Sequence, residues 1–284
     1  MPTVRRRFLD LDYGQIHYRT ARGGRPAGEG GPAPVILLHS AAQSSAMLSD
    51  LVAALGETRQ VIAPDLPGCG DTAALPDKPT VSVEDLADWL AGTLGRLGIE
   101  QADVHGLHLG ARIGVDLSLR YPGLVRRLIV DGNGFYSGEL GAAMLANVAP
   151  ELKPDLDGLY LMRAWHYIRD YYQFFPWFQR GAENVRGGGL PAPEVIHEKL
   201  MEVLRNGQTY FRPYHAAFGY PMEERLPKVT VPTLITAARD DNVFEHLDRS
   251  HALLPGAEKA ATAGILSAKA ARETAALFAG FLDR

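Results

Sequence analysis

The chain contains almost no cysteine: Cys69 is the only one in 284 residues. A single cysteine cannot form an intrachain disulfide, and it excludes metal sites built from several cysteines. A sequence without disulfides is compatible with a reducing compartment, so we expect a cytoplasmic protein. We interpret Cys69 itself as a structural residue.

Long apolar runs and a large excess of one charge are also missing. No window approaches the roughly 18 apolar residues that a membrane span requires. The chain has 29 Lys and Arg residues against 33 Asp and Glu residues, so it offers no basic field to a nucleic acid. Residues 5–7 are all arginine, but residues 8–12 alternate like a strand, and we expect no signal peptide. We expect a small-molecule substrate as the partner, and neither a nucleic acid nor a membrane. The sequence leaves open whether the protein forms a homodimer.

Short apolar runs without alternation recur along the sequence, separated mostly by helical patterns. Such runs are typical of parallel strands that are buried on both faces. A hairpin precedes them, and a Gly/Pro-rich connection over 23–34 joins the two parts. The pattern predicts an α/β fold with a doubly wound, mostly parallel sheet. The hairpin strands are expected at 8–11 and 15–19, and the buried strands at 35–38, 61–63, 104–107, 128–130 and 233–237.

The clearest helix is expected over 83–97. Ser82 and Asp85 are placed as a capping pair at its start, and four leucines recur on one stripe. This helix would cover one face of the sheet.

A segment of different character lies between the strands at 128–130 and 233–237. Nine of the nineteen residues over 160–178 are aromatic, which marks a separate apolar surface. We interpret 134–222 as a helical cap inserted over the carboxyl edge of the sheet. The core would then consist of a first part, 1–133, and a second part, 223–284.

The central motif is Gly106-Leu107-His108-Leu109-Gly110, where a strand turns directly into a helix. This resembles the nucleophile elbow G-x-S-x-G, with histidine in place of serine. The glycines have a physical role, because the central residue sits in a strained turn and the two backbones pass closely. The strand before the motif and the helix after it give the pattern its specificity.

Three further stretches follow in the same order as in the α/β-hydrolase superfamily, which the chain resembles over nearly its whole length. They are 35–41, similar to the strand and oxyanion loop; 63–72, similar to the D-x-x-G-x-G-x-S turn; and 231–241, which leads to the position of the triad acid. The resemblance implies an α/β-hydrolase fold. It also implies that Asp241 is the acid, with Asp240 as the second choice.

The family's triad histidine has no counterpart. The matching position, after Gly264, is occupied by Ile265. Ordinary serine hydrolysis is therefore not available, because the elbow has no hydroxyl and no base beside it.

A histidine on the elbow projects farther than serine and could reach Asp241 directly. Such a dyad would fix the tautomer of His108 and leave its other ring nitrogen to act as general base or nucleophile. Asp131, at the end of a neighbouring strand, is an alternative partner. The backbone N–H groups of Leu109 and Ala41 would form the oxyanion hole.

The cap is expected to supply substrate contacts from Arg163, Trp165, His166 and Trp177. Arg163 could hold a carboxylate or enolate, and pairing with Asp170 is an equally good interpretation.

His39 is a further substrate-binding candidate, although in this fold a histidine there usually bonds to backbone near the oxyanion loop. A zinc site formed by His39, His105 and His108 has no supporting ligand spacing. We therefore expect no metal and no cofactor.

Three functional hypotheses remain from the sequence. The first is hydrolysis of a small carbonyl compound by His108 and Asp241. The second is a cofactor-independent lyase or decarboxylase that uses the same base and oxyanion hole. The third is a ligand-binding pseudoenzyme that has lost its chemistry.

Overall fold

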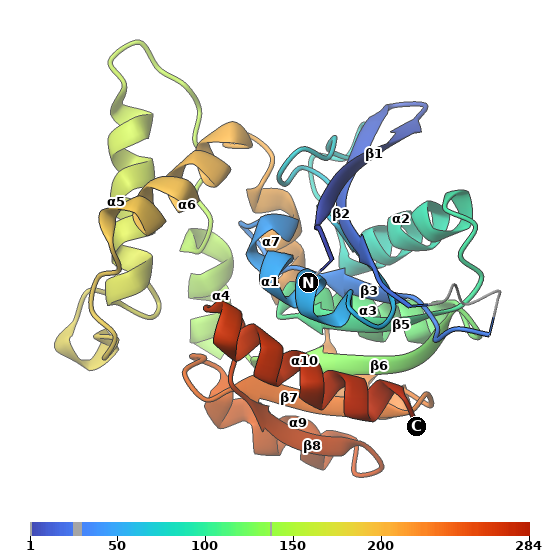
Figure 1. The fold of residues 1–284 in the computed structure, drawn as a ribbon. Coiled ribbons are helices and arrows are strands. Elements are labelled where there is room, and N and C mark those ends of the chain that lie inside the picture. Colours follow the sequence, from blue (N-terminus) through green and yellow to red (C-terminus); the bar gives the residue numbers. More distant parts are fainter. Residues whose placement is uncertain (1, 25–29, 137) are drawn as a thin grey trace.

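The computed structural model describes residues 2–24, 30–136 and 138–284. The predicted connection over 23–34 therefore lies partly outside the described residues. Within the described parts, strands and helices alternate along the chain (Figure 1).

An eight-stranded sheet forms the centre of the molecule, in the order β1-β2-β4-β3-β5-β6-β7-β8. Strand β2 runs antiparallel to β1 and β4, and the pairs from β4 through β8 are all parallel. The predicted α/β fold with a mostly parallel sheet is confirmed. The strands are β1 (Arg5–Leu11), β2 (Gly14–Arg22), β3 (Val35–Leu38), β4 (Gln60–Pro64), β5 (Ala102–Leu107), β6 (Val125–Asp131), β7 (Thr233–Ala238) and β8 (Glu258–Thr262).

Helices cover both faces of this sheet. On one face, α1 (Ser49–Leu55) and α10 (Ala268–Leu282) pack against alternate strand residues such as Val35 and Ile129. On the other face, Ile36 and Val130 pack against the helices α2 (Val83–Arg96), α3 (Leu109–Arg120) and α9 (Leu247–Leu253). The chain is therefore doubly wound. Among the described residues, no helix has the length and apolarity that a membrane crossing requires.

Helix α2 begins where the capping pair predicts. The Ser82 side chain accepts a hydrogen bond from the Asp85 backbone N–H at 3.1 Å, and Asp85 accepts one from the Ser82 N–H at 3.0 Å. These two bonds satisfy amides that the first turn leaves without helical partners. Leu86, Leu90 and Leu94 are buried against the sheet, as the predicted stripe requires.

The chain between β6 and β7 is helical and has an apolar cluster of its own. Met144, Tyr167 and Tyr210 are among the buried residues of this cluster. In Figure 1, α5 and α6 lie beside the sheet, away from the helices that cover it. We keep the interpretation of 134–222 as a cap, with α7 as its connection to the core, because Ala216 and Ala217 pack into the main core cluster. The helices are α4 (Gly138–Asn147), α5 (Leu159–Gln173), α6 (Pro193–Arg205), α7 (Phe211–Gly219) and the short α8 (Met222–Arg225).

Candidate active site

His108 occupies a sharp turn between β5 and α3. Strand β5 ends at Leu107 and α3 begins at Leu109, so His108 alone makes the connection. Its backbone has φ +52° and ψ −102°, outside the regions that residues with a side chain ordinarily adopt. A histidine held in such a conformation costs folding free energy, and residues of this kind concentrate at functional sites.

The two glycines of the motif permit this turn. A Cβ added to Gly106 would lie 2.1 Å from the carbonyl carbon and oxygen of Gly110, and one added to Gly110 would lie 2.5 Å from the Leu38 carbonyl oxygen. Any larger residue would push α3 away from β5 or from β3. The spacing G-x-H-x-G is therefore a packing requirement of the elbow.

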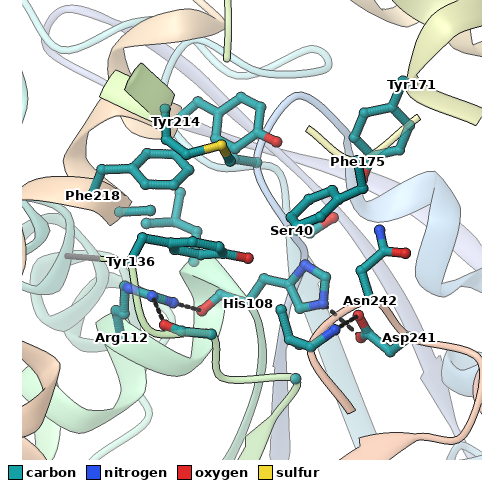
Figure 2. A pocket seen from close by; sticks show the side chains of 17 residues that line it. Ser40, His108, Arg112, Tyr136, Tyr171, Phe175, Tyr214, Phe218, Asp241 and Asn242 are labelled. Atoms are coloured by element: carbon teal, nitrogen blue, oxygen red, sulfur yellow. Dashed lines mark hydrogen bonds and ion pairs between the residues drawn. The ribbon is translucent and has the colours of Figure 1, made fainter. Parts of the chain in front are cut away.

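The His108 imidazole meets Asp241, which follows β7. His108 Nε2 lies 2.7 Å from Asp241 Oδ2, and the Val243 N–H donates to Asp241 Oδ1 at 3.1 Å. Figure 2 shows the second ring nitrogen, Nδ1, on the side of the ring away from Asp241, toward the open pocket. The His108 side chain is 35% exposed and the Asp241 side chain 12%, so the imidazole is open to a ligand and the carboxylate is mostly enclosed.

The two groups shift each other's pKa in opposite directions. Burial lowers the pKa of His108, but the charge of Asp241 and its hydrogen bond outweigh burial, and the net pKa lies above the ordinary 6.5. Burial raises the pKa of Asp241, and the charge and hydrogen bond of His108 reverse this and bring it below 3.8. Near neutral pH, Asp241 is therefore an anion that orients the imidazole.

Leu109 and Ala41 are the residues whose backbone amides are predicted to form the oxyanion hole. Leu109 and Ala41 both line the same pocket, and neither amide donates a backbone hydrogen bond to another described residue. The Leu109 N–H belongs to the first turn of α3, where amides have no helical partner and the helix end is positive. These donors can bind a carbonyl oxygen or the negative charge that develops on it.

Aromatic side chains form the rest of the wall, and sequence reasoning missed most of them. Figure 2 shows the Tyr136 hydroxyl directed into the space beside His108. Tyr136 follows the carboxyl end of β6, an edge where this class of sheet binds ligands, and that position was an available signal. Arg112, one helical turn after His108, was also missed. The missed lining residues are Ser40, Arg112, Gly132, Gly134, Tyr136, Met144, Tyr171, Phe175, Tyr214, Ala217, Phe218, Asn242 and Val243.

The comparisons with known proteins identify the fold. A family model described as alpha/beta hydrolase fold matches residues 33–160, from the start of β3 through the elbow to the beginning of α5. The chain has the α/β-hydrolase fold. An enol-lactonase from Burkholderia xenovorans is similar in structure, with a TM-score of 0.73 and 18% identity over 98% of this chain and 100% of that one.

Curated relatives match over a shorter stretch of the chain. A hydrolase of uncharacterised activity from Saccharomyces cerevisiae is 31% identical over 115 residues, 40% of this chain and 39% of that protein. The cis-3-alkyl-4-alkyloxetan-2-one decarboxylase of Shewanella oneidensis is 31% identical over 138 residues, 46% of this chain and 40% of that protein. The chain thus aligns with less than half the length of either relative, and both matches support the resemblance to the α/β-hydrolase superfamily.

The alternative acids have other positions in this fold. Asp131 Oδ2 lies 3.0 Å from His105 Nε2, and both residues are buried. Asp131, the alternative partner predicted for His108, is therefore paired with His105. The Asp131 charge still contributes to raising the pKa of His108. Asp240 is exposed and does not line the pocket. Of the three candidate carboxylates, only Asp241 contacts the elbow imidazole.

His39 does not contact the pocket, which corrects its prediction as a substrate-binding residue. Its Nε2 accepts a hydrogen bond from the Leu66 N–H at 2.9 Å, and its Nδ1 lies 2.7 Å from the Ser40 carbonyl oxygen. Both ring nitrogens therefore hold backbone next to the oxyanion loop. Since His39, His105 and His108 each have a separate partner, the zinc interpretation has no geometric support.

Arg163 is exposed on α5 and does not line the pocket that contains His108, so the structure does not support its prediction as a substrate ligand. Its alternative pairing with Asp170 is wrong. Asp170 is buried between two other arginines, with Arg169 at 2.7 Å and Arg180 at 2.7 Å. The helical spacing predicted that Arg163 and Asp170 lie on one face of the helix. In the structure the Asp170 carboxylate forms its ion pairs with Arg169 and Arg180 instead.

The predicted cap ligands Trp165, His166 and Trp177 also stay outside the pocket. Trp165 and Trp177 pack against the cap's own cluster, and the Trp177 indole N–H donates to the Val148 carbonyl oxygen at 3.0 Å. His166 has a buried Nδ1 without a hydrogen-bond partner among the described residues. The two tryptophans belong to the packing of the cap, and the aromatic residues of the 160–178 segment that line the pocket are Tyr171 and Phe175.

Ile265, which the sequence resemblance aligned with the family's histidine, follows β8. It packs against the cluster that contains Phe278 of α10. His108 itself contacts Asp241 directly.

This wall predicts different effects for two aromatic substitutions in the same segment. Phe175→Ala is expected to change ligand affinity at least several-fold with a small loss of stability, because Phe175 lines the pocket. Trp177→Ala is expected to lower the melting temperature, since truncating a core tryptophan costs roughly 3 to 5 kcal/mol and the partly buried Trp177 should lose a share of that. Calorimetric binding and thermal melts of both variants provide the check. Equal effects on affinity from both would contradict this assignment of the wall.

Proposed function

We propose that this chain is an enzyme that hydrolyses a small carbonyl compound, with His108 as the general base and Asp241 as the group that orients it. The observation that carries the proposal is the 2.7 Å contact between His108 Nε2 and Asp241 Oδ2 at a strained elbow. Leu109 and Ala41, whose amides would form the oxyanion hole, line the same pocket.

In this proposal the Asp241 carboxylate accepts the Nε2–H of His108, so the lone pair of Nδ1 faces the pocket. Nδ1 takes a proton from a water molecule while the water oxygen forms a bond to the carbonyl carbon. The carbonyl electron pair moves to its oxygen, which the Leu109 and Ala41 amides stabilise. Collapse of this intermediate breaks the bond to the leaving group, which takes the proton back from His108. General-base catalysis contributes roughly 100-fold to 10,000-fold, and each oxyanion donor about 3 to 4 kcal/mol.

The phenols of the wall support a polar, oxygen-bearing substrate. Burial raises the pKa of Tyr136, Tyr171 and Tyr214, so all three hydroxyls stay protonated across the physiological range. A protonated phenol in an aromatic wall can donate a hydrogen bond to a carbonyl or an ester oxygen.

The relatives support the reaction class. Their names include hydrolases, among them 2-hydroxymuconate semialdehyde hydrolase of Pseudomonas putida, and the similar solved structures include a lactonase. The semialdehyde and the lactone in these two names are carbonyl compounds. We therefore propose for this chain the reaction class, hydrolysis of a small carbonyl compound, and no individual substrate.

A second candidate is a lyase reaction. The match to a β-lactone decarboxylase, the cis-3-alkyl-4-alkyloxetan-2-one decarboxylase, favours it. In a lyase reaction that passes through an enolate, His108 would move a proton to or from carbon, and the same two amides would stabilise the enolate oxygen. Loss of CO2 from an oxetan-2-one itself gives an alkene and needs no net proton transfer, so there the amides would act on the lactone carbonyl oxygen. Analysis of the products distinguishes the two reactions, since hydrolysis incorporates oxygen from labelled water and a lyase reaction does not.

The activity should increase with pH. A general base must be deprotonated, and the pKa of His108 in the folded protein lies above 6.5. We expect kcat/KM to rise through a pKa above 6.5. In Asp241→Asn, the charge that raises the pKa is gone, so the remaining activity should rise at lower pH than in the unmodified protein. The measurement is a pH–rate profile of both proteins. If kcat/KM rises over the same pH range in Asp241→Asn as in the unmodified protein, the result would argue against the dyad.

The proposal is tested with a panel of short aryl esters and small lactones, assayed with the unmodified protein and with His108→Ala. Turnover that depends on His108 supports it. If turnover is present and a stoichiometric organophosphate adduct maps to a serine, the reaction uses another nucleophile and the proposal is wrong.

A further inference from the structure

Arg112 is a buried cation in the wall of the candidate active site. It lies in the first turn and a half of α3, one helical turn after His108, and it is 5% exposed. Nη1 donates to the His108 carbonyl oxygen at 3.2 Å and Nη2 to the Gly134 carbonyl oxygen at 2.7 Å. Nε is buried and has no hydrogen-bond partner among the described residues. Figure 2 shows the guanidinium below Tyr136, beside the floor of the pocket.

No carboxylate among the described residues forms an ion pair with Arg112. A second buried arginine shows the contrast: Arg59 is 1% exposed, and it contacts the carboxylates of Asp283 and Asp103. A buried charge without a counter-charge destabilises a protein, because two carbonyl oxygens replace only part of the lost hydration. The position of Arg112 near the positive end of α3 increases this cost.

The charges of the pocket leave Arg112 unmatched. Its charged lining residues are His108, Asp241 and Arg112, and the Asp241 carboxylate is hydrogen-bonded to His108. The helix end of α3 and the amides of Leu109 and Ala41 add positive potential at the same place. The site therefore lacks one negative charge, and a ligand can supply it.

We propose that the pocket binds a carboxylate-bearing substrate and that Arg112 provides its counter-charge. This inference rests on the proposed function, because it names the substrate class of the same site. A carboxylate fits the planar, donor-rich guanidinium, which has N–H groups left over after the two carbonyl contacts. The aromatic wall from Tyr136, Phe175 and Phe218 would cover the apolar part of the molecule. Arg112 thus takes the role that sequence reasoning gave to Arg163.

The test compares benzoate with benzamide, which have the same shape and differ in charge. Calorimetric titration of the unmodified protein is expected to give a dissociation constant for benzoate at least tenfold lower than for benzamide. This preference should weaken as salt is added, because screening reduces the attraction between charges. Equal affinity, or tighter binding of benzamide, would overturn the proposal without any variant.

Three variants separate a ligand role of Arg112 from a purely structural one. Arg112→Met should remove the preference for benzoate, whereas Arg112→Lys should keep a preference even if both probes bind more weakly. Arg120→Gln, on the same helix and outside the pocket, should leave the ratio unchanged and controls for net charge. If Arg112→Met weakens both probes equally and the ratio persists, Arg112 only holds the elbow in place and the proposal is wrong. If this variant does not fold, the unmodified protein and Arg112→Lys decide.

The same titration in His108→Ala distinguishes this inference from the catalytic proposal. Retained preference for benzoate together with lost turnover supports both. Retained preference with full turnover would leave the carboxylate site standing and remove the His108 mechanism.

Discussion

His108→Ala is expected to lower kcat/KM by roughly 100-fold to 10,000-fold, because it removes the general base. Asp241→Asn should also lower kcat/KM by a large factor. A neutral amide lacks the negative charge that orients the Nε2–H of His108 and stabilises the imidazolium. The double variant should be scarcely slower than His108→Ala. Residues that act as one unit have non-additive effects, and the 2.7 Å contact between them predicts this behaviour.

Asp240→Asn is the matched control for this cycle. Asp240 is the exposed neighbour of Asp241 and does not line the pocket, so its amide variant should keep nearly full activity. Losses that multiply in the double variant would show that His108 and Asp241 act separately. A large effect of Asp240→Asn would mean that the acid is misassigned.

Gly132→Ala is expected to disrupt the same pair without changing either member. Gly132 follows β6 with φ +65°, and an added Cβ would lie 2.4 Å from His108 Cδ2 and 2.9 Å from Asp241 Oδ2. The methyl group must therefore displace the imidazole or the carboxylate. We expect turnover to fall about as far as in Asp241→Asn, together with a loss of stability of roughly 1 to 2 kcal/mol from the left-handed backbone.

Gly123→Ala provides a control for the backbone effect. Gly123 has φ +93°, but an added Cβ meets no atom within 4 Å. Both alanine variants should lose stability in thermal melts, Gly132→Ala at least as much as Gly123→Ala, and only Gly132→Ala should lose turnover. If Gly132→Ala folds and keeps full activity, the contact between His108 and Asp241 is not needed for the reaction.

The elements around the elbow were predictable because their signals are local. Buried runs such as the one over 104–107, the capping pair of α2 and the two glycines of the elbow each reflect a requirement that a few neighbouring residues satisfy. Predicting Asp241 as the partner of His108 also required the order of the motifs along the chain, because the two residues are 133 positions apart in sequence. Family-like spacing supplied that long-range information.

The wall of the pocket was not predictable to the same degree. The aromatic run over 160–178 indicated an apolar surface, but it did not indicate which side chains would fill the cap's own core. Trp177 and Tyr167 pack on each other there, while Phe175 reaches the pocket. Arg112 had a usable signal, because a residue four positions after His108 lies on the same helical face. An arginine on a helix usually has a solvated guanidinium, so the sequence alone did not predict that Arg112 is buried.

The most direct measurement is a crystal structure with a slowly reacting carbonyl ligand bound. The proposed function predicts the carbonyl oxygen within hydrogen-bond distance of the Leu109 and Ala41 amides. It also predicts His108 Nδ1 facing a water molecule or the carbonyl carbon, while Nε2 keeps its contact with Asp241. A ligand bound away from the elbow, or an imidazole turned so that Nδ1 bonds to the protein, would contradict the assignment of His108 as the reacting base.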